Sequence, residues 1–181
     1  MPNQPTILLV EDSTEDYLLF KQATLKIFPH AALHLVPDFP AALHYLYGTG
    51  PYRNRDLFPF PSCVFVDLTL PAIPGKALVK WIREQPEFKK LLIVVLTGSR
   101  DGKDISELYR LGANSFINKT ASPDEFARTL RDMNTFWVSH GLITDFSAPI
   151  TNPGKPSADT RGASFFYIKP DWPDFEPPPS S

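Results

Sequence analysis

Hydrophobic positions along the chain follow two alternating patterns. Short, continuously apolar runs are typical of buried strands, and apolar residues spaced three or four apart are typical of amphipathic helices. The runs predict strands at 6–10, 32–36, 63–67, 91–97 and 114–118. The helical spacing predicts helices at 14–28, 41–47, 76–84 and 104–111, and a fifth that begins at 123. Five strand–helix units joined by short loops predict an α/β fold, a doubly wound parallel sheet with helices on both faces.

Capping signals mark several of these helix ends. Ser13 is a good N-cap, and Leu19, Ala23, Lys26 and Ile27 follow it at helical spacing. Gly112 is a typical residue just after a helix C-terminus. The segment Ser122-Pro123-Asp124-Glu125 is a capping box with proline in the first turn. These signals support the predicted positions of the first, fourth and fifth helices.

The chain changes character near residue 143. Prolines recur through 143–181 with Gly, Ser, Thr and Asp between them, a composition that favours irregular structure. We therefore expect a domain at 1–142 and a proline-rich, largely irregular tail at 143–181. An aromatic stretch, 164–168 with Trp172 and Phe175, leaves two alternatives open. It packs back on the domain in extended form, or it is a docking motif for a partner.

Composition and charge exclude several classes of function. The 181 residues carry a net charge of −2, which gives no electrostatic case for binding nucleic acid. No apolar stretch has membrane-spanning length, and the first twelve residues lack the basic region of a signal peptide. We therefore expect a cytoplasmic protein without a membrane partner. The single cysteine, Cys63, cannot form a disulfide within the chain and is expected to be a buried thiol.

Polar residues close four of the predicted strands. Glu11 and Asp12 follow the first strand, Asp67 ends the third, Thr97 ends the fourth and Lys119 follows the fifth. In an open parallel sheet, ligands bind outside the carboxyl ends of the strands, so these side chains are expected to converge in one crevice. A carboxylate at a buried strand end is costly unless something satisfies it. The set indicates a divalent cation and a phosphoryl group on Asp67.

Four segments in this order carry a family resemblance. LLVED, VFVDLTLPAIPG, VVLTGS and LGANSFINK together resemble the receiver domain of two-component response regulators, over roughly residues 5–142. The insert at 47–52 and the phrase LGANSFINK look most like the small stand-alone receivers associated with phytochrome-type histidine kinases. The resemblance implies a flavodoxin-like fold with five parallel strands in the order 2-1-3-4-5, which agrees with the five predicted strand–helix units.

The resemblance also implies a metal site around the phosphoacceptor. Asp67 would accept the phosphoryl group, and Glu11 and Asp12 would hold Mg²⁺ with it, Asp12 being the direct ligand of the pair. The backbone carbonyl of Thr69 would complete the protein ligands. Few are needed, because Mg²⁺ keeps several waters and bridges carboxylate to phosphate. Physical chemistry agrees, since adjacent carboxylates do not stay ionised together without a cation.

Three further residues would complete the phosphoryl site and its response. Lys119 would pair with one phosphoryl oxygen, and Thr97 would donate its hydroxyl to another. These groups and Mg²⁺ would neutralise the oxygens of the transferred phosphoryl group. Phe116 would be the aromatic residue that changes rotamer when Thr97 moves, although a simple core position is its more common use.

The resemblance implies a signalling protein rather than an enzyme. It would take the phosphoryl group from a histidine kinase or a phosphotransfer protein, and would at most catalyse its own phosphorylation and dephosphorylation. The helix after Thr97, the last strand and the last helix would form the output face, which could also pair two copies of the chain as a homodimer. Tyr109 and Phe136 are the candidate exposed contacts on it. With no nucleic-acid partner, signalling would proceed by protein–protein contact.

One departure from the receiver pattern keeps an alternative open. Receivers usually carry proline after the active-site lysine, joined by a cis bond, and here the residue is Thr120. We expect a trans bond, because a cis bond before a residue other than proline costs about 2.5–4 kcal/mol. If the change disables Lys119, the chain would be a degenerate receiver that serves as an unphosphorylated docking module. A haloacid-dehalogenase-type phosphohydrolase fits less well, since Thr69 stands where that chemistry needs an acid.

Overall fold

Strands and helices alternate through the described residues of the computed structural model, which are 5–99, 102–119 and 122–142. The strands are β1 (Thr6–Val10), β2 (Ala32–Val36), β3 (Cys63–Asp67), β4 (Leu92–Thr97) and β5 (Ser115–Asn118). The helices are α1 (Thr14–Ile27), α2 (Phe39–Tyr47), α3 (Gly75–Glu84), α4 (Gly102–Leu111) and α5 (Pro123–Ser139). Two short 3₁₀ turns, Gly50–Tyr52 and Pro86–Phe88, were not predicted. Every predicted strand and helix is present, with ends shifted by no more than two residues.

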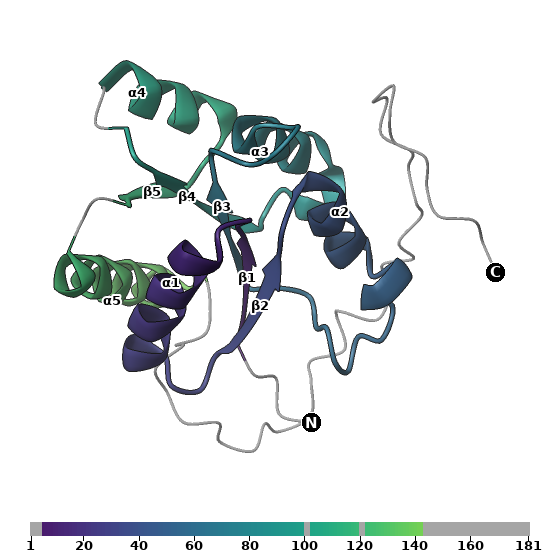
Figure 1. Cartoon of the computed structure of the whole chain (residues 1–181), viewed down its shortest axis with the longest axis horizontal. Helices are drawn as coiled ribbons and strands as arrows, with labels where there is room; N and C mark the ends of the chain where they lie inside the picture. The colour runs from purple at the N-terminus through teal and green to yellow at the C-terminus, as the bar shows by residue number, and fades with distance from the viewer. Residues whose placement is uncertain (1–4, 100–101, 120–121, 143–181) are drawn as a thin grey trace.

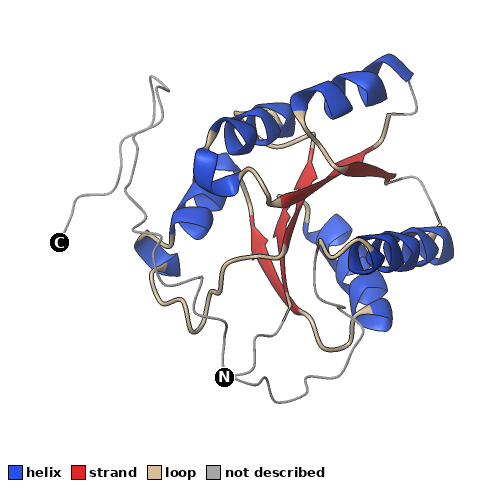
Figure 2. Cartoon of the chain, turned by 180° about the vertical axis from the view of Figure 1, so that it is seen from behind, coloured by secondary structure: helices blue, strands red, loops and turns tan. Residues whose placement is uncertain are grey.

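All five strands are parallel and form one sheet in the order β2-β1-β3-β4-β5. The flavodoxin-like arrangement predicted above is therefore confirmed. The sheet lies between two layers of helices (Figures 1 and 2). In this order β1 and β3 are central neighbours, so the residues that follow them lie side by side at the carboxyl edge of the sheet.

The strands are apolar throughout because both faces of the sheet are covered. Alternate residues point to opposite faces, which divides the core in two. On one face, Leu8, Val64 and Ile93 pack with α2, α3 and Leu108 of α4. On the other face, the strands pack with α1 and α5 through the residues Ile7, Leu9, Phe65 and Val94. The side chains at the strand ends are likewise divided between the two faces of the sheet.

The inner face of α1 differs from the spacing used to predict the helix. Ala23 and Ile27 are buried, but Leu19 is 53% exposed, and the Lys26 side chain is 66% exposed. Phe20 takes the central place, with its ring edge-on to Phe65 of β3 at 4.9 Å between centroids. The aromatic ring fills the space over the sheet that a leucine one position earlier cannot reach, since neighbours on a helix point about 100° apart.

The predicted helix caps are confirmed where the structure describes them. The Ser13 hydroxyl accepts the Asp16 N–H, and Ser122 and Glu125 form the capping box of α5. Gly112 directly follows the last residue of α4 and has a φ of 100°, as expected of a glycine at a helix C-terminus. The Lys119–Thr120 bond and the tail at 143–181 lie outside the described residues. Among the helices of the described part of the chain, none is long and apolar enough to cross a membrane.

Candidate functional site

Three carboxylates meet at the carboxyl edge of the sheet. Glu11 and Asp12 follow β1, and Asp67 ends the neighbouring strand β3, so that one oxygen of each lies within 4.8 Å of the others. Glu11 is 2% exposed and Asp67 is 3% exposed, whereas Asp12 is open to solvent. Carboxylate oxygens are the ligands that Mg²⁺ prefers, and an open side leaves room for the waters that it retains. The residues present therefore fit a hard divalent cation.

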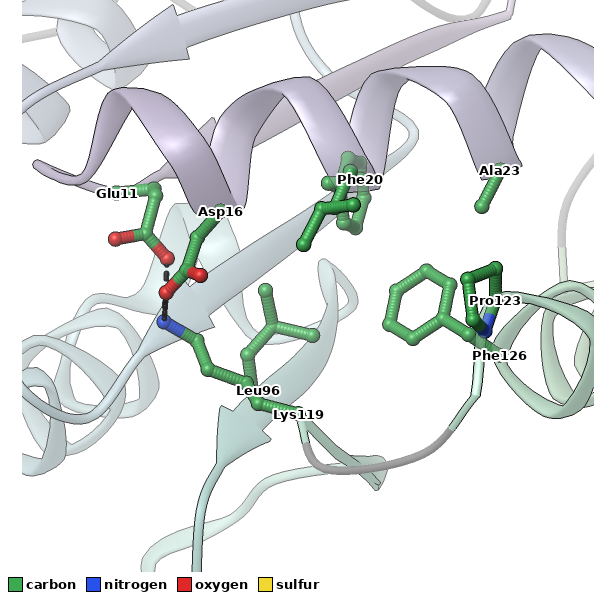
Figure 3. Close-up of a pocket in the computed structure, with 9 residues that line it drawn as sticks. Glu11, Asp16, Phe20, Ala23, Leu96, Lys119, Pro123 and Phe126 are labelled. Carbon is green, nitrogen blue, oxygen red and sulfur yellow. Dashed lines mark hydrogen bonds and ion pairs between the residues drawn. The ribbon is translucent and has the colours of Figure 1, made fainter.

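Lys119 brings a positive charge to this cluster from the end of β5. Its Nζ lies 2.7 Å from Glu11 Oε2, 2.7 Å from Asp16 Oδ2 and 3.1 Å from Asp67 Oδ2 (the first two are drawn in Figure 3). Its backbone N–H donates to the Thr97 carbonyl at 2.8 Å, which continues the β4–β5 pairing past the last strand residue. The lysine is thus fixed at both ends, by the sheet and by carboxylates.

The charges of the site act on one another. Burial lowers the pKa of the Lys119 ammonium, but its hydrogen bonds to Asp16 and Glu11 and the charge of Asp67 outweigh this, so the net pKa is raised. Burial raises the pKa of Glu11, against the opposing hydrogen bonds from Lys119 and the Ser13 N–H. Lys119 stays charged at neutral pH and balances only part of the negative charge around it. The remainder favours a bound cation.

Thr97 and Phe116 lie on the other side of the same edge. Thr97 is 3% exposed, and its Oγ1 accepts the Ser99 N–H at 3.0 Å. Phe116 packs with the core on the α2–α4 side, edge-on to Tyr109 of α4 at 6.1 Å between centroids. Val95 pairs with Phe116 and Thr97 with Asn118, so the hydroxyl and the aromatic ring belong to adjacent strands. The structure therefore places Thr97 and Phe116 on adjacent strands, two positions apart in the register, and the Thr97 hydroxyl accepts a hydrogen bond within its own loop.

The loop after β3 positions Asp67 and Thr69. Gly75, the first residue of α3, donates its N–H to the Leu68 carbonyl at 3.1 Å and returns the chain to the end of β3. Thr69 is exposed two residues after Asp67. The carboxylate cluster is defined by side-chain oxygens, so the Thr69 carbonyl as a metal ligand stays a prediction.

Sequence reasoning missed Asp16 as a site residue. Asp16 lies in the first turn of α1, and its carboxylate accepts a hydrogen bond from Lys119. A signal was present in the sequence. A helix that starts directly after a strand carries its first turn at the carboxyl edge of the sheet, so an acid there is a candidate for the site.

A cavity of about 110 Å³ adjoins these charges between α1 and α5 (Figure 3). Asp16, Glu11 and Lys119 form its polar end. Its apolar wall is formed by Leu19, Phe20, Ala23, Leu96, Pro123 and Phe126. The aliphatic stem of Lys119 runs beside Leu96 along one side of this space, and its ammonium lies at the carboxylates (Figure 3).

Comparison with known proteins agrees with this geometry. The profile of the response regulator receiver domain matches residues 7–131. Response regulator Rcp1 of Synechocystis sp. is 30% identical over 132 residues, which are 73% of this chain and 88% of Rcp1. The crystal structure of its Mn²⁺-bound form has a TM-score of 0.64 at 28% identity, covering 77% of this chain and 97% of that one.

Two further solved structures are similar over most of their length. RPA3017, a response regulator in red light signalling of R. palustris, has a TM-score of 0.69 at 27% identity, with 82% of this chain and 99% of that chain covered. The phosphorylated cyanobacterial phytochrome response regulator RcpA has a TM-score of 0.65 at 29% identity, with 76% and 96% covered. With its strand order, its carboxylate cluster and its lysine in place, the chain belongs to the response regulator receiver family.

Proposed function

We propose that this receiver accepts a phosphoryl group on Asp67 from a histidine kinase or a phosphotransfer protein, with Mg²⁺, and signals by protein–protein contact. One observation carries the proposal. The Asp67 carboxylate lies 3.1 Å from the Lys119 ammonium and shares a site with two further carboxylates, at the carboxyl edge of a parallel sheet. Phosphoryl transfer to a carboxylate needs this combination of nucleophile, cation site and fixed positive charge.

The chemistry proceeds at one oxygen of Asp67. This oxygen attacks phosphorus in line, so that an O–P bond forms while the bond to the donor breaks and its electron pair leaves with the donor. Mg²⁺ held by Asp12, Glu11, Asp67 and the Thr69 carbonyl would neutralise charge on the phosphoryl oxygens. Lys119 contacts one of these oxygens. The Thr97 hydroxyl donates a hydrogen bond to another.

The residues that would respond to phosphorylation are Thr97 and Phe116, on β4 and β5. Thr97 and Phe116 lie on adjacent strands, and Phe116 contacts Tyr109, which is 50% exposed on α4. Phe136 of α5 is 55% exposed. We propose that a shift of Thr97 toward the phosphoryl group moves Phe116 and changes the surface formed by α4, β5 and α5. This surface would serve the target protein or a second copy of the chain.

The proposal is tested by incubating the protein with acetyl phosphate and Mg²⁺ and locating the phosphate by peptide mass spectrometry. We expect one added phosphoryl group, on the peptide that contains Asp67, and none when EDTA replaces Mg²⁺. The absence of any phosphopeptide, with a histidine-kinase donor as well, would favour the docking-module alternative instead.

The two adjacent acids are expected to contribute unequally to Mg²⁺ binding. Glu11 Oε1 already accepts the Ser13 N–H and Oε2 accepts from Lys119, whereas Asp12 has no such partner among the described residues. We therefore expect Asp12→Ala to weaken Mg²⁺ binding far more than Glu11→Ala does, measured by isothermal titration calorimetry. Glu15→Ala, in the exposed first turn of α1, controls for the lost charge. Equal losses for Asp12→Ala and Glu11→Ala would contradict this assignment.

We propose that the receiver domain is residues 1–142 and that the tail at 143–181 is dispensable for its chemistry. The buried core described above uses residues between 7 and 137, and the carboxylate site lies wholly within it. Deletion of 145–181 should leave the Tm and the phosphorylation of Asp67 nearly unchanged, as measured by calorimetry and mass spectrometry. A large fall in Tm would instead place the aromatic stretch near Trp172 in the core.

A further inference from the structure

The Lys119 ammonium has as many carboxylate partners as it has N–H donors. An ammonium carries three donors, and Glu11, Asp16 and Asp67 each place an oxygen within 3.1 Å of Nζ. Two of these partners also belong to the carboxylate cluster that fits a cation, and Asp16 does not. A cation at the cluster and a phosphoryl group on Asp67 would therefore engage the carboxylates of Glu11 and Asp67. The contact between Asp16 and Lys119 would remain.

Asp16 is held by a rigid element. Its backbone N–H donates to the Ser13 hydroxyl at 3.2 Å, so the cap of α1 fixes the turn from which its side chain extends. Lys119, by contrast, is followed by Thr120, a residue without the fixed φ of proline. The contact joins α1 to the end of β5, 103 residues apart along the chain. A helix that begins after β1 thus helps to orient a lysine that follows β5.

We propose that Asp16 is a positioning residue that holds the Lys119 ammonium beside Asp67 while a cation and a phosphoryl group take up the other carboxylates. The inference rests on the function proposed above and adds a residue to it. In the loaded site, one N–H of Lys119 stays on Asp16 and the N–H released by Glu11 goes to a phosphoryl oxygen. Asp16 contacts neither phosphorus nor the cation and acts only through Lys119.

The first test compares Asp16→Asn with Glu15→Gln. Both changes remove one negative charge from the same helical turn, but only Asp16 contacts Lys119, since Glu15 is exposed. We expect Asp16→Asn to slow phosphorylation of Asp67 by acetyl phosphate about tenfold at saturating Mg²⁺, as expected for the loss of a hydrogen bond between charged groups. We expect Glu15→Gln to retain the wild-type rate, and both variants to have the same Mg²⁺ affinity.

A second test asks whether Asp16 acts through Lys119. In a Lys119→Ala background, Asp16→Asn should have no further effect on the rate, because the group that it positions is gone. Asp16→Glu, which keeps the charge, should recover most of the rate and guards against a fold defect in Asp16→Asn. Equal rates for Asp16→Asn and Glu15→Gln would overturn the inference, and so would a tenfold loss that persists without Lys119.

The two proposals fail separately in these experiments. If the wild-type protein takes no phosphoryl group from acetyl phosphate or a kinase, the proposed function is wrong. If the wild-type protein is phosphorylated and the Asp16 variants match the Glu15 control, only the positioning role is wrong.

Discussion

Asp67→Asn is expected to abolish phosphorylation of this protein. The amide has nearly the shape of the carboxylate and can still accept a hydrogen bond from Lys119, but it is not a nucleophile toward phosphorus. The other carboxylates of the cluster do not replace it. Glu11 and Asp12 are the ligands expected for the cation, and Glu11 also accepts the Ser13 N–H. A loss of labelling of at least a hundredfold is therefore expected, on the order of what a missing catalytic group costs.

The measurement is the fraction of protein that gains one phosphoryl group with acetyl phosphate and Mg²⁺, by intact mass. Asp56→Asn is a matched control, because Asp56 is an exposed acid in the loop before β3, outside the carboxylate cluster. It should label like the wild type. Labelling that persists undiminished in Asp67→Asn would remove the central claim about this site.

Gly75→Ala is expected to cause the largest loss of stability of any change considered for this chain. A Cβ on Gly75 would lie 1.9 Å from the Asp67 carbonyl oxygen and 3.0 Å from the Leu68 Cα. These are backbone atoms at the end of a central strand, so they cannot turn away as a flexible side chain would. Either α3 or the end of β3 has to move, and a clash with backbone places the cost at the upper end of the usual range for overpacking, about 3 kcal/mol.

Thermal unfolding should show a fall in Tm of roughly 6–12 °C for that loss, given the size of the chain. Because the displaced atoms include the backbone of Asp67, the variant should also be phosphorylated more slowly. Gly98→Ala is the control for stability, since a Cβ there meets nothing within 4 Å and the residue is exposed. Its Tm should stay close to that of the wild type. Similar Tm values for the two variants would contradict the steric argument.

Much of the fold could be predicted because its signals are local. A short apolar run rich in β-branched and aromatic residues, such as 63–67, is typical of a strand covered on both faces, and the capping box at Ser122 sets where α5 starts through contacts within one turn. Which residues gather at the carboxyl edge of the sheet followed from the parallel topology alone. Once the strands are parallel, Glu11, Asp67 and Lys119 must end on the same side, and the structure places them in contact.

The tertiary structure decided which neighbours these residues have. Whether Leu19 or Phe20 enters the core depends on how α1 is rotated against the sheet, and the space beside Phe65 favours the larger ring. The same rotation turns Asp16, and not Glu15, toward Lys119. Two adjacent acids are equivalent in local sequence terms, so periodicity cannot choose between them.

Close approaches within the loops that follow the strands could not be predicted from the sequence either. That Gly75 touches the Asp67 carbonyl, and that the Thr97 hydroxyl accepts from Ser99, depends on the path of loops whose shape is set by contacts on both sides. The sequence by itself determined the strands, their parallel direction and the set of groups that gather at one edge, because short-range patterns and strand–helix alternation suffice for these. Only packing between α1, β3 and β5 decided which carboxylates hold the lysine, because that choice rests on contacts between residues more than 50 positions apart.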